Sequence, residues 1–245
     1  NGLIKSWSLD LIQNLPNSGF KEWQEDLETM LKFLPPHISI YDLNIESGTV
    51  FKKLFDLGKL SLPNEDESFK NSELTNFILK GAGYSRYEIS NYAFPGHQSR
   101  HNRVYWSGLG WWSFGQGSTS SPWGEKFTRP RISKDYKKWV ANQCEVKLET
   151  SLVNQRTLYS ELDEKIMLGM RLKEGVNIYS LFNEQNWDKK KYAINLKKLI
   201  KEWDKYLESG LLIKRGDRFC LSDPKGMELS NQILISMFSW WEKIS

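Results

Sequence analysis

The chain has 245 residues, of which 39% are hydrophobic and 13% aromatic, and its 34 basic and 30 acidic side chains leave a formal charge of +4. This composition can build a sizeable core and excludes an intrinsically disordered chain. The length suits one large domain, or one domain and a smaller second unit. The small, dispersed positive surplus does not indicate nucleic-acid binding, which favours a concentrated basic face.

The two cysteines, Cys144 and Cys220, lie far apart and form no CxxC pair, so zinc or iron–sulfur spacing is absent. We interpret them as reduced thiols of a cytoplasmic protein. No apolar run approaches the roughly 20 residues that span a bilayer, and no signal peptide is recognisable. Because the sequence opens in mid-pattern on Asn1 rather than on Met, we expect that further residues precede it.

The first half of the chain has the pattern of an α/β protein. Residues 6–12 form a short apolar run that predicts a buried strand. Residues 18–34 carry apolar side chains at helical spacing and are followed by two prolines, which end a helix. Residues 37–46 alternate and favour a second strand. Strand, helix and strand in this order predict a parallel sheet.

The next segments continue the pattern. We expect a loop over 47–64, a helix over 68–84 and a third strand over 85–93 in the same helix-then-strand order. The glycine-rich stretch 110–117 suggests a strand with a sharp turn. It lacks the context of a dinucleotide fingerprint. Residues 133–143 predict a short helix.

After residue 150 the character changes. Three helices and a hairpin around Arg215-Gly216-Asp217 are expected, with a final helix from about residue 223. This is the outline of a winged-helix module, which serves for DNA binding or as a structural cap. Beyond the run 189–191 there is no concentrated basic stripe. We therefore interpret the segment as a structural appendage.

Two carboxylates stand out in predicted strands. Asp10 lies inside an apolar run, where a carboxylate is costly unless it is paired, and it either caps a backbone turn or contacts a ligand. Glu88 is a functional acid or the ion-pair partner of Arg86 or Arg100, and its neighbourhood favours the ion pair.

Two of the three histidines lie close together. His97 follows the turn dipeptide Pro95-Gly96 and is expected to be solvated. His101 precedes Tyr105 and Trp106, so that in a helix His101 and Tyr105 share a face. Imidazole ligates haem iron and aromatic rings stack on a porphyrin, but the residues alone favour a structural, hydrogen-bonded histidine over haem or another ligand.

A family resemblance adds to these observations. The stretches 10–16, 36–51, 60–67, 82–108 and 113–120 resemble, in order and spacing, the radical SAM proteins similar to oxygen-independent coproporphyrinogen III oxidase. The segment from KIMLGMRLKEGVNI to RFCLSDPKG is similar to the C-terminal helical domain of that family. The HNRVYW stretch (101–106) looks like the HNxxYW motif of the haem-chaperone branch.

The resemblance implies roles for particular residues. His101 would contact haem and is a possible ligand of its iron, with Asn102, Tyr105 and Trp106 shaping the site. Asp10 matches the family's aspartate that contacts S-adenosylmethionine. The match also points, more weakly, to Asn44 and Thr119 as further contacts of S-adenosylmethionine.

The chain also departs from the family pattern. The CxxxCxxC loop that holds the [4Fe–4S] cluster is absent, as is the glycine-rich segment that receives the methionine end of S-adenosylmethionine. Ser113, Ser118 and Thr119 stand where the family usually has glycine, alanine and histidine. We therefore expect that this chain alone cannot cleave S-adenosylmethionine.

The resemblance implies the following organisation. Residues 1–145 would form the second half of a (β/α) radical SAM barrel, with an exposed strand edge that lowers stability and favours aggregation. Residues 150–245 would form a helical, winged-helix-like domain. The intact protein would bind a [4Fe–4S] cluster, S-adenosylmethionine and haem, and would deliver haem to a cytoplasmic or membrane-associated target protein. The alternative is an oxidase that decarboxylates the propionates of coproporphyrinogen III.

Overall fold

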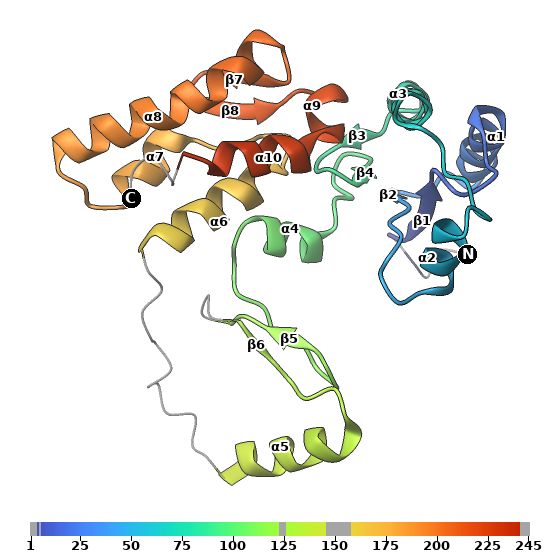
Figure 1. Ribbon diagram of the computed structural model, residues 1–245, viewed down its shortest axis with the longest axis horizontal. Coiled ribbons are helices and arrows are strands. Elements are labelled where there is room, and N and C mark those ends of the chain that lie inside the picture. The colour runs from blue at the N-terminus through green and yellow to red at the C-terminus, as the bar shows by residue number, and fades with distance from the viewer. Residues whose placement is uncertain (1–3, 5, 123–125, 146–157, 241–245) are drawn as a thin grey trace.

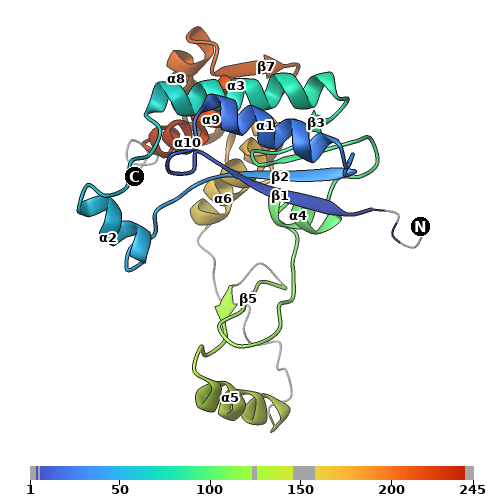
Figure 2. The same ribbon diagram turned by 90° about the vertical axis from the view of Figure 1, so that its right-hand side faces the viewer.

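The computed structural model describes residue 4 and residues 6–122, 126–145 and 158–240. Strand β1 (Ser8–Gln13), helix α1 (Phe20–Leu31) and strand β2 (His37–Asp42) come first. β1 pairs with β2 in parallel, from Ser8 opposite His37 to Gln13 opposite Asp42. Figure 2 shows the two strands side by side beneath α1 and helix α3 (Glu65–Gly81). The predicted strand–helix–strand unit is confirmed.

The two faces of these strands differ in polarity, because successive side chains of a strand point to opposite sides. On one face Ile38 and Ile40 are buried in a cluster with Trp23 and Leu27 of α1 and Leu79 of α3. On the other face lie the polar side chains that line the cleft described below. β1 is an end strand of the sheet, and Asp10 and Ile12 are exposed. The prediction that this strand is buried is therefore wrong.

The predicted third strand is also wrong in detail. The segment 85–93 forms two short strands, β3 (Ser85–Arg86) and β4 (Asn91–Ala93), in a sheet of order β1-β2-β4-β3. β4 runs antiparallel to β2 and to β3. The chain reverses because side chains bond the intervening backbone: Arg86 Nε donates to Ile89 O (2.9 Å), and Ser90 N donates to the Glu88 carboxylate (3.2 Å). Such local bonds compete with strand pairing.

Other helices and hairpins follow. α2 (Val50–Asp56) forms inside the expected loop, because Thr49 accepts a hydrogen bond from Lys52 N at its start. α3 (Glu65–Gly81) begins earlier than expected, at the capping box of Asn64 and Glu67. Three further elements are α4 (Arg100–Trp106), α5 (Ser133–Glu145) and the hairpin of β5 (Thr119–Ser120) and β6 (Phe127–Thr128). Figure 1 shows the hairpin and α5 extending away from the main body.

No strand forms over the predicted stretch 110–117. Its contribution to pairing is an isolated bridge between Trp111 and Ser121. A Cβ on Gly110 would collide with Pro122 O, so this glycine permits a close backbone approach.

The C-terminal segment builds a second buried cluster around Phe182, Leu199, Trp203 and Trp240. Its elements are α6 (Leu158–Met170), α7 (Ile178–Asn183), α8 (Lys189–Glu208), β7 (Leu212–Arg215), β8 (Arg218–Leu221), α9 (Lys225–Glu228) and α10 (Ser230–Phe238). The expected hairpin is present, and the expected final helix is broken at Leu229, whose backbone is not helical (φ −92°, ψ 11°). The domain boundaries 1–145 and 150–245 stay a prediction.

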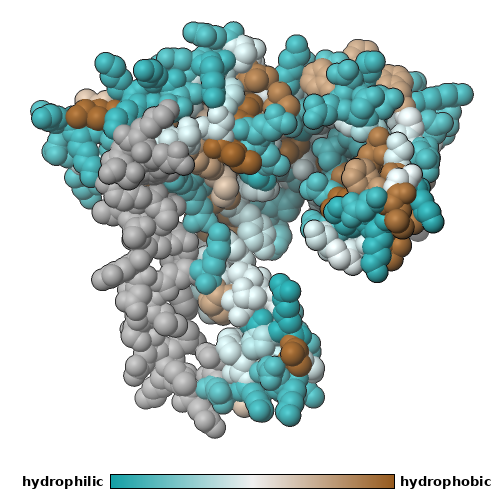
Figure 3. All heavy atoms as spheres, in the orientation of Figure 1, coloured by the Kyte–Doolittle hydropathy of each residue, from teal (hydrophilic) through white to brown (hydrophobic). Residues whose placement is uncertain are grey.

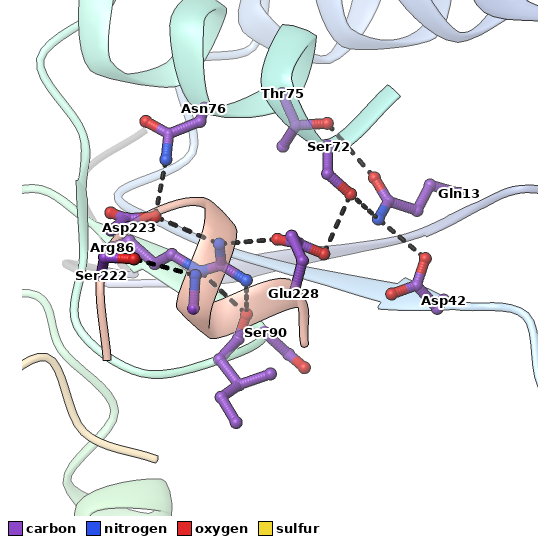
Figure 4. Close-up of polar contacts among 12 residues, drawn as sticks. Gln13, Asp42, Ser72, Thr75, Asn76, Arg86, Ser90, Ser222, Asp223 and Glu228 are labelled. Carbon is purple, nitrogen blue, oxygen red and sulfur yellow. Dashed lines mark hydrogen bonds and ion pairs between the residues drawn. The ribbon is translucent and has the colours of Figure 1, made fainter. Parts of the chain in front are cut away.

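A buried polar joint connects the two clusters (Figure 4). Arg86 of β3 pairs with Asp223 (3.2 Å) and with Glu228 of α9 (2.8 Å). Ser72 of α3 donates to the same Glu228 (3.0 Å) and accepts from Gln13 of β1 (3.1 Å). The joint therefore fixes the sheet against the C-terminal helices. Among the described helices, none is both long and apolar enough to cross a membrane.

Candidate functional site

The HNRVYW stretch folds as helix α4, so that the condition for a shared face is met. Ser99 caps the helix by accepting a hydrogen bond from Asn102 N (3.2 Å). The rings of His101 and Tyr105 meet edge to face, with centroids 4.9 Å apart. His101 is exposed, and Tyr105 continues the aromatic contact to Trp111 at 4.7 Å. The imidazole of His101 is thus the exposed end of a series of contacting rings, His101, Tyr105 and Trp111, which we call the aromatic series.

Two contacts hold α4 against the C-terminal segment. The guanidinium of Arg171 lies 5.3 Å from the ring centre of Trp106. Arg103 forms an ion pair with Glu174 at 2.5 Å, and the neighbouring cation holds the pKa of the Glu174 carboxyl below its usual range although its partial burial acts the other way. Helix α4 is therefore held against the C-terminal segment.

An aromatic cleft of about 420 Å³ opens beside α4. Its lining includes three of the residues assigned by resemblance to a haem site: Asn102, Tyr105 and Trp106. Trp111 adds a further ring, and Glu164 and Leu168 of α6 form part of the wall. Lys126 lies at this cleft in an ion pair with Glu164 (2.7 Å). Flat, largely apolar ligands fit such a lining.

Glu88 contributes a buried carboxyl to the aromatic cleft, with 1% of its surface exposed. The expected ion pair with Arg86 or Arg100 is not formed, because Arg86 binds Asp223 and Glu228 instead. Glu88 accepts hydrogen bonds from Asn91 Nδ2 and Ser90 N. Burial raises the pKa of the Glu88 carboxyl, and these bonds oppose the shift only in part.

A polar cleft of about 650 Å³ lies on the polar face of β1 and β2. Asp10 lines it together with Ser8, His37 and Ser39. Tyr41 and Asn102 line both clefts, so the two clefts adjoin. The position of Asp10 in this cleft is that of a side chain able to contact a ligand, with hydroxyls beside it that donate and accept hydrogen bonds.

His97 also lines the polar cleft and is partly exposed, so the expectation that it is solvated stays a prediction. It is half-buried, and its Nδ1 lies 3.2 Å from Ser6 Oγ.

His37 is the residue that the sequence analysis missed. It is buried, with 5% of its surface exposed, and both ring nitrogens bond to hydroxyls, Nδ1 to Ser8 Oγ and Nε2 to Tyr87 Oη, each at 2.8 Å. Burial lowers the pKa of His37, although the charge of Asp10 acts in the opposite direction. The available signal was the alternation of His37, Ser39 and Tyr41 with apolar residues in β2.

Asn44 and Thr119 are not brought to either cleft. Asn44 is exposed beyond the end of β2. Thr119 lies in β5, where its hydroxyl bonds to Thr128 at 2.7 Å. The neighbouring departure Ser118 donates to Gly115 O (2.7 Å), and Ser113 N donates to Ser120 Oγ (2.9 Å). These residues hold the hairpin segment together.

The described residues do not fit an iron–sulfur cluster. They contain no group of three cysteine, histidine, aspartate or glutamate side chains placed to hold a metal ion. Cys220 is buried in β8 and donates to Glu174 O (3.2 Å), and the side chain of Cys144 lies outside the described residues. With two cysteines in 245 residues, the chain cannot supply the three thiolates that such a cluster needs.

Comparisons with known proteins identify relatives of this chain. No family model matches the chain. The haem chaperone HemW of Synechocystis sp. is 36% identical over 98% of this chain and 60% of its own length. HemW of Lactococcus lactis is 30% identical over 92% of this chain and 56% of its own length. The chain thus spans somewhat more than half the length of these two curated relatives.

The fold has a solved counterpart. Coproporphyrinogen III oxidase (HemN) from Escherichia coli, a radical SAM enzyme, superposes with a TM-score of 0.67 over 95% of this chain and 55% of its own, at 13% identity. At 13% identity this likeness shows the fold alone. The sequence places the chain among the radical SAM proteins similar to coproporphyrinogen III oxidase, as a homologue of the haem chaperones HemW.

Proposed function

We propose that this chain is the haem-binding part of a haem chaperone, and that the intact protein binds S-adenosylmethionine and a [4Fe–4S] cluster and passes haem to an acceptor protein. The observation that carries the proposal is the placement of His101 on α4 at the end of the aromatic series Tyr105–Trp111, beside the cleft lined by Trp106. A neutral imidazole ligates haem iron, and the rings offer stacking surface to the macrocycle.

The polar cleft is the proposed site for S-adenosylmethionine. Its strand residues present a carboxylate, Asp10, among the hydroxyls of Ser8, Ser39 and Tyr41. A carboxylate and hydroxyls suit the ribose hydroxyls and the amino group of such a ligand. When bound to an intact cluster site, S-adenosylmethionine supplies radical chemistry. The residues of this chain do no more than hold and orient it.

The oxidase alternative has less support. The comparison with coproporphyrinogen III oxidase concerns the fold alone, at 13% identity, whereas the curated relatives with 30–36% identity are haem chaperones. Anaerobic conversion of coproporphyrinogen III by the intact protein would favour the oxidase.

The proposal is tested by titrating haem into the chain and following the Soret band. We expect His101→Ala to weaken haem binding by at least about tenfold, which corresponds to about 1.4 kcal/mol, because the axial ligand is lost. His97→Ala is the matched control, since it removes a histidine outside the aromatic cleft, and it should bind haem like the wild type. Equal affinity of the wild type and His101→Ala would contradict the assignment.

A further inference from the structure

His37 and Tyr87 have no role in the proposed function, although His37 lines the polar cleft. Both are buried, with 5% and 2% of their surface exposed, and their side chains bond to each other at 2.8 Å. They come from different elements, His37 from the start of β2 and Tyr87 from the turn after β3.

The hydrogen bonds continue at both ends of this pair. On one side His37 bonds to Ser8, whose hydroxyl donates to Asp10 Oδ1 in the polar cleft (3.3 Å). On the other side the Tyr87 hydroxyl accepts from Ser99 N (3.3 Å), and Ser99 is the residue that caps α4. A continuous chain of hydrogen bonds, which we call the relay (Asp10, Ser8, His37, Tyr87, Ser99), therefore runs through two buried side chains from Asp10 on β1 to Ser99 at the cap of α4, and both of its ends line the polar cleft.

The donors and acceptors of the relay can be assigned one by one. A carboxylate only accepts, so the single hydroxyl hydrogen of Ser8 points to Asp10 and the Ser8 oxygen must accept from His37 Nδ1–H. In a neutral imidazole the other nitrogen, Nε2, then accepts, and the Tyr87 hydroxyl donates to it. Asp10 thereby selects one tautomer of a histidine that it does not touch.

The environment keeps both rings neutral. Burial lowers the pKa of His37 and outweighs the opposing charge of Asp10. Burial also raises the pKa of Tyr87 to about 12; the charge of Glu88 adds to this, whereas the backbone bond from Ser99 and the charge of Arg103 oppose it. At neutral pH each hydrogen bond of the relay therefore has one defined donor and one defined acceptor.

We propose that His37 and Tyr87 are positioning residues that couple the polar cleft to helix α4, so that a change at Asp10 alters ligand binding at His101. A ligand that bonds to Asp10 competes with the Ser8 hydroxyl for the carboxylate. The Ser8 hydrogen is then free to bond to His37 Nδ1, so that His37 can adopt the other tautomer. The hydrogen bond between Tyr87 and His37 changes its direction, and with it the bond from Ser99 at the cap of α4. The effect on haem rests on the proposed function, whereas the relay itself does not.

The relay is tested directly by nitrogen NMR of the chain labelled with ¹⁵N-histidine, since three histidines are readily assigned by substitution. We expect His37 to be neutral at pH 7 with the proton on Nδ1. Asp10→Asn should introduce the second tautomer, because its amide can donate to Ser8 and free the Ser8 hydrogen for His37 Nδ1. Tyr87→Phe leaves Asp10 and Ser8 in place, so it should keep the proton on Nδ1 and shift only the Nε2 signal, which loses its hydrogen bond. Tyr84→Phe is the matched control: it removes another buried tyrosine hydroxyl, one that donates to Pro35 O (2.7 Å) outside the relay, and it should leave the His37 signals unchanged.

The coupling is tested by haem titration of the same variants. Asp10→Asn and Tyr87→Phe should each change the dissociation constant for haem by about fivefold, and the double variant should change it no more than either single one, because both interrupt one relay. Tyr84→Phe should bind like the wild type. Absence of haem binding by the wild type would refute the proposed function and leave the NMR result to judge the relay. Normal haem affinity in both relay variants, or a proton on Nε2 in the wild type, would overturn the inference.

Discussion

The polar and aromatic clefts share Tyr41 and Asn102, but their other walls come from different parts of the chain. The polar cleft is built from residues 6–102 alone: the hydroxyl-bearing face of β1 and β2, and the segment 96–102 that leads into α4. The aromatic cleft needs, besides α4, Lys126 and helix α6 of the C-terminal segment. The difference teaches that one cleft requires only the sheet and the start of α4, whereas the other exists only when the two buried clusters are held together.

The largest expected effect comes from a substitution at the joint between the two buried clusters. Arg86→Leu leaves Asp223 and Glu228 without their buried partner, which should lower the free energy of unfolding by about 3–5 kcal/mol. Chemical denaturation measures this loss. Haem binding should suffer more than binding in the polar cleft, since the joint positions the C-terminal wall of the aromatic cleft.

Arg215→Leu is the control for this experiment, because Arg215 is exposed at the β7–β8 turn. It should leave both the unfolding curve and haem binding near those of the wild type. A stable Arg86→Leu variant with unchanged haem affinity would show that the joint does not position the aromatic cleft.

A second prediction concerns the buried acid of the aromatic cleft. The folded pKa of Glu88 is raised, so the unfolded carboxyl releases its proton at lower pH than the folded one, and the stability contributed by this group falls as pH rises. Glu88→Gln keeps an acceptor for Asn91 and Ser90 but removes the charge. Relative to the wild type, the variant should gain stability between pH 4.5 and pH 8 in thermal melts. A constant difference across this range would contradict the assignment.

A third prediction concerns His37 in the polar cleft. Its contribution to the free energy of unfolding should depend on pH with the opposite sign and by a smaller amount. The folded pKa of His37 lies below its ordinary value of 6.5, so at mildly acidic pH the unfolded chain binds a proton that the folded chain does not. Its contribution to stability is complete above about pH 6.5 and is lost as pH falls toward the folded pKa. Replacing His37 by glutamine should remove this slope from the difference between the two unfolding curves.

Asp163 must be included in such curves, because burial raises its pKa to about 7 and lowers stability over a neighbouring pH range. The His37→Gln variant carries the same Asp163, so that its contribution cancels in the difference. An unchanged slope would indicate that His37 is not the titrating group.

The parts of the fold that the sequence predicts are those specified locally. The pairing of β1 with β2 follows from alternation and from the two prolines after α1. A helix at HNRVYW was only a condition of the sequence argument, and the structure meets that condition. The role of Glu88 was mispredicted because its neighbour Arg86 offers a charge partner at short range, whereas the fold brings Asp223 and Glu228 to that arginine from the distant end of the chain.

The candidate site shows the same limit. Asp10, Tyr105 and Trp106 could be selected from the family motif, and the structure places each of them in a cleft. His37 could not, since its importance depends on tertiary bonds to Ser8 and Tyr87 that no local pattern encodes. Asn44 and Thr119, selected by the same resemblance, lie outside both clefts and stay predictions.

The central claim is that α4 presents His101 to haem iron. Electron paramagnetic resonance of the ferric haem complex tests it most directly, because axial ligation by imidazole changes the spectrum of the iron. The wild type and His97→Ala should share one histidine-ligated spectrum, and His101→Ala should lose it. A histidine-ligated signal that persists in His101→Ala would contradict the account.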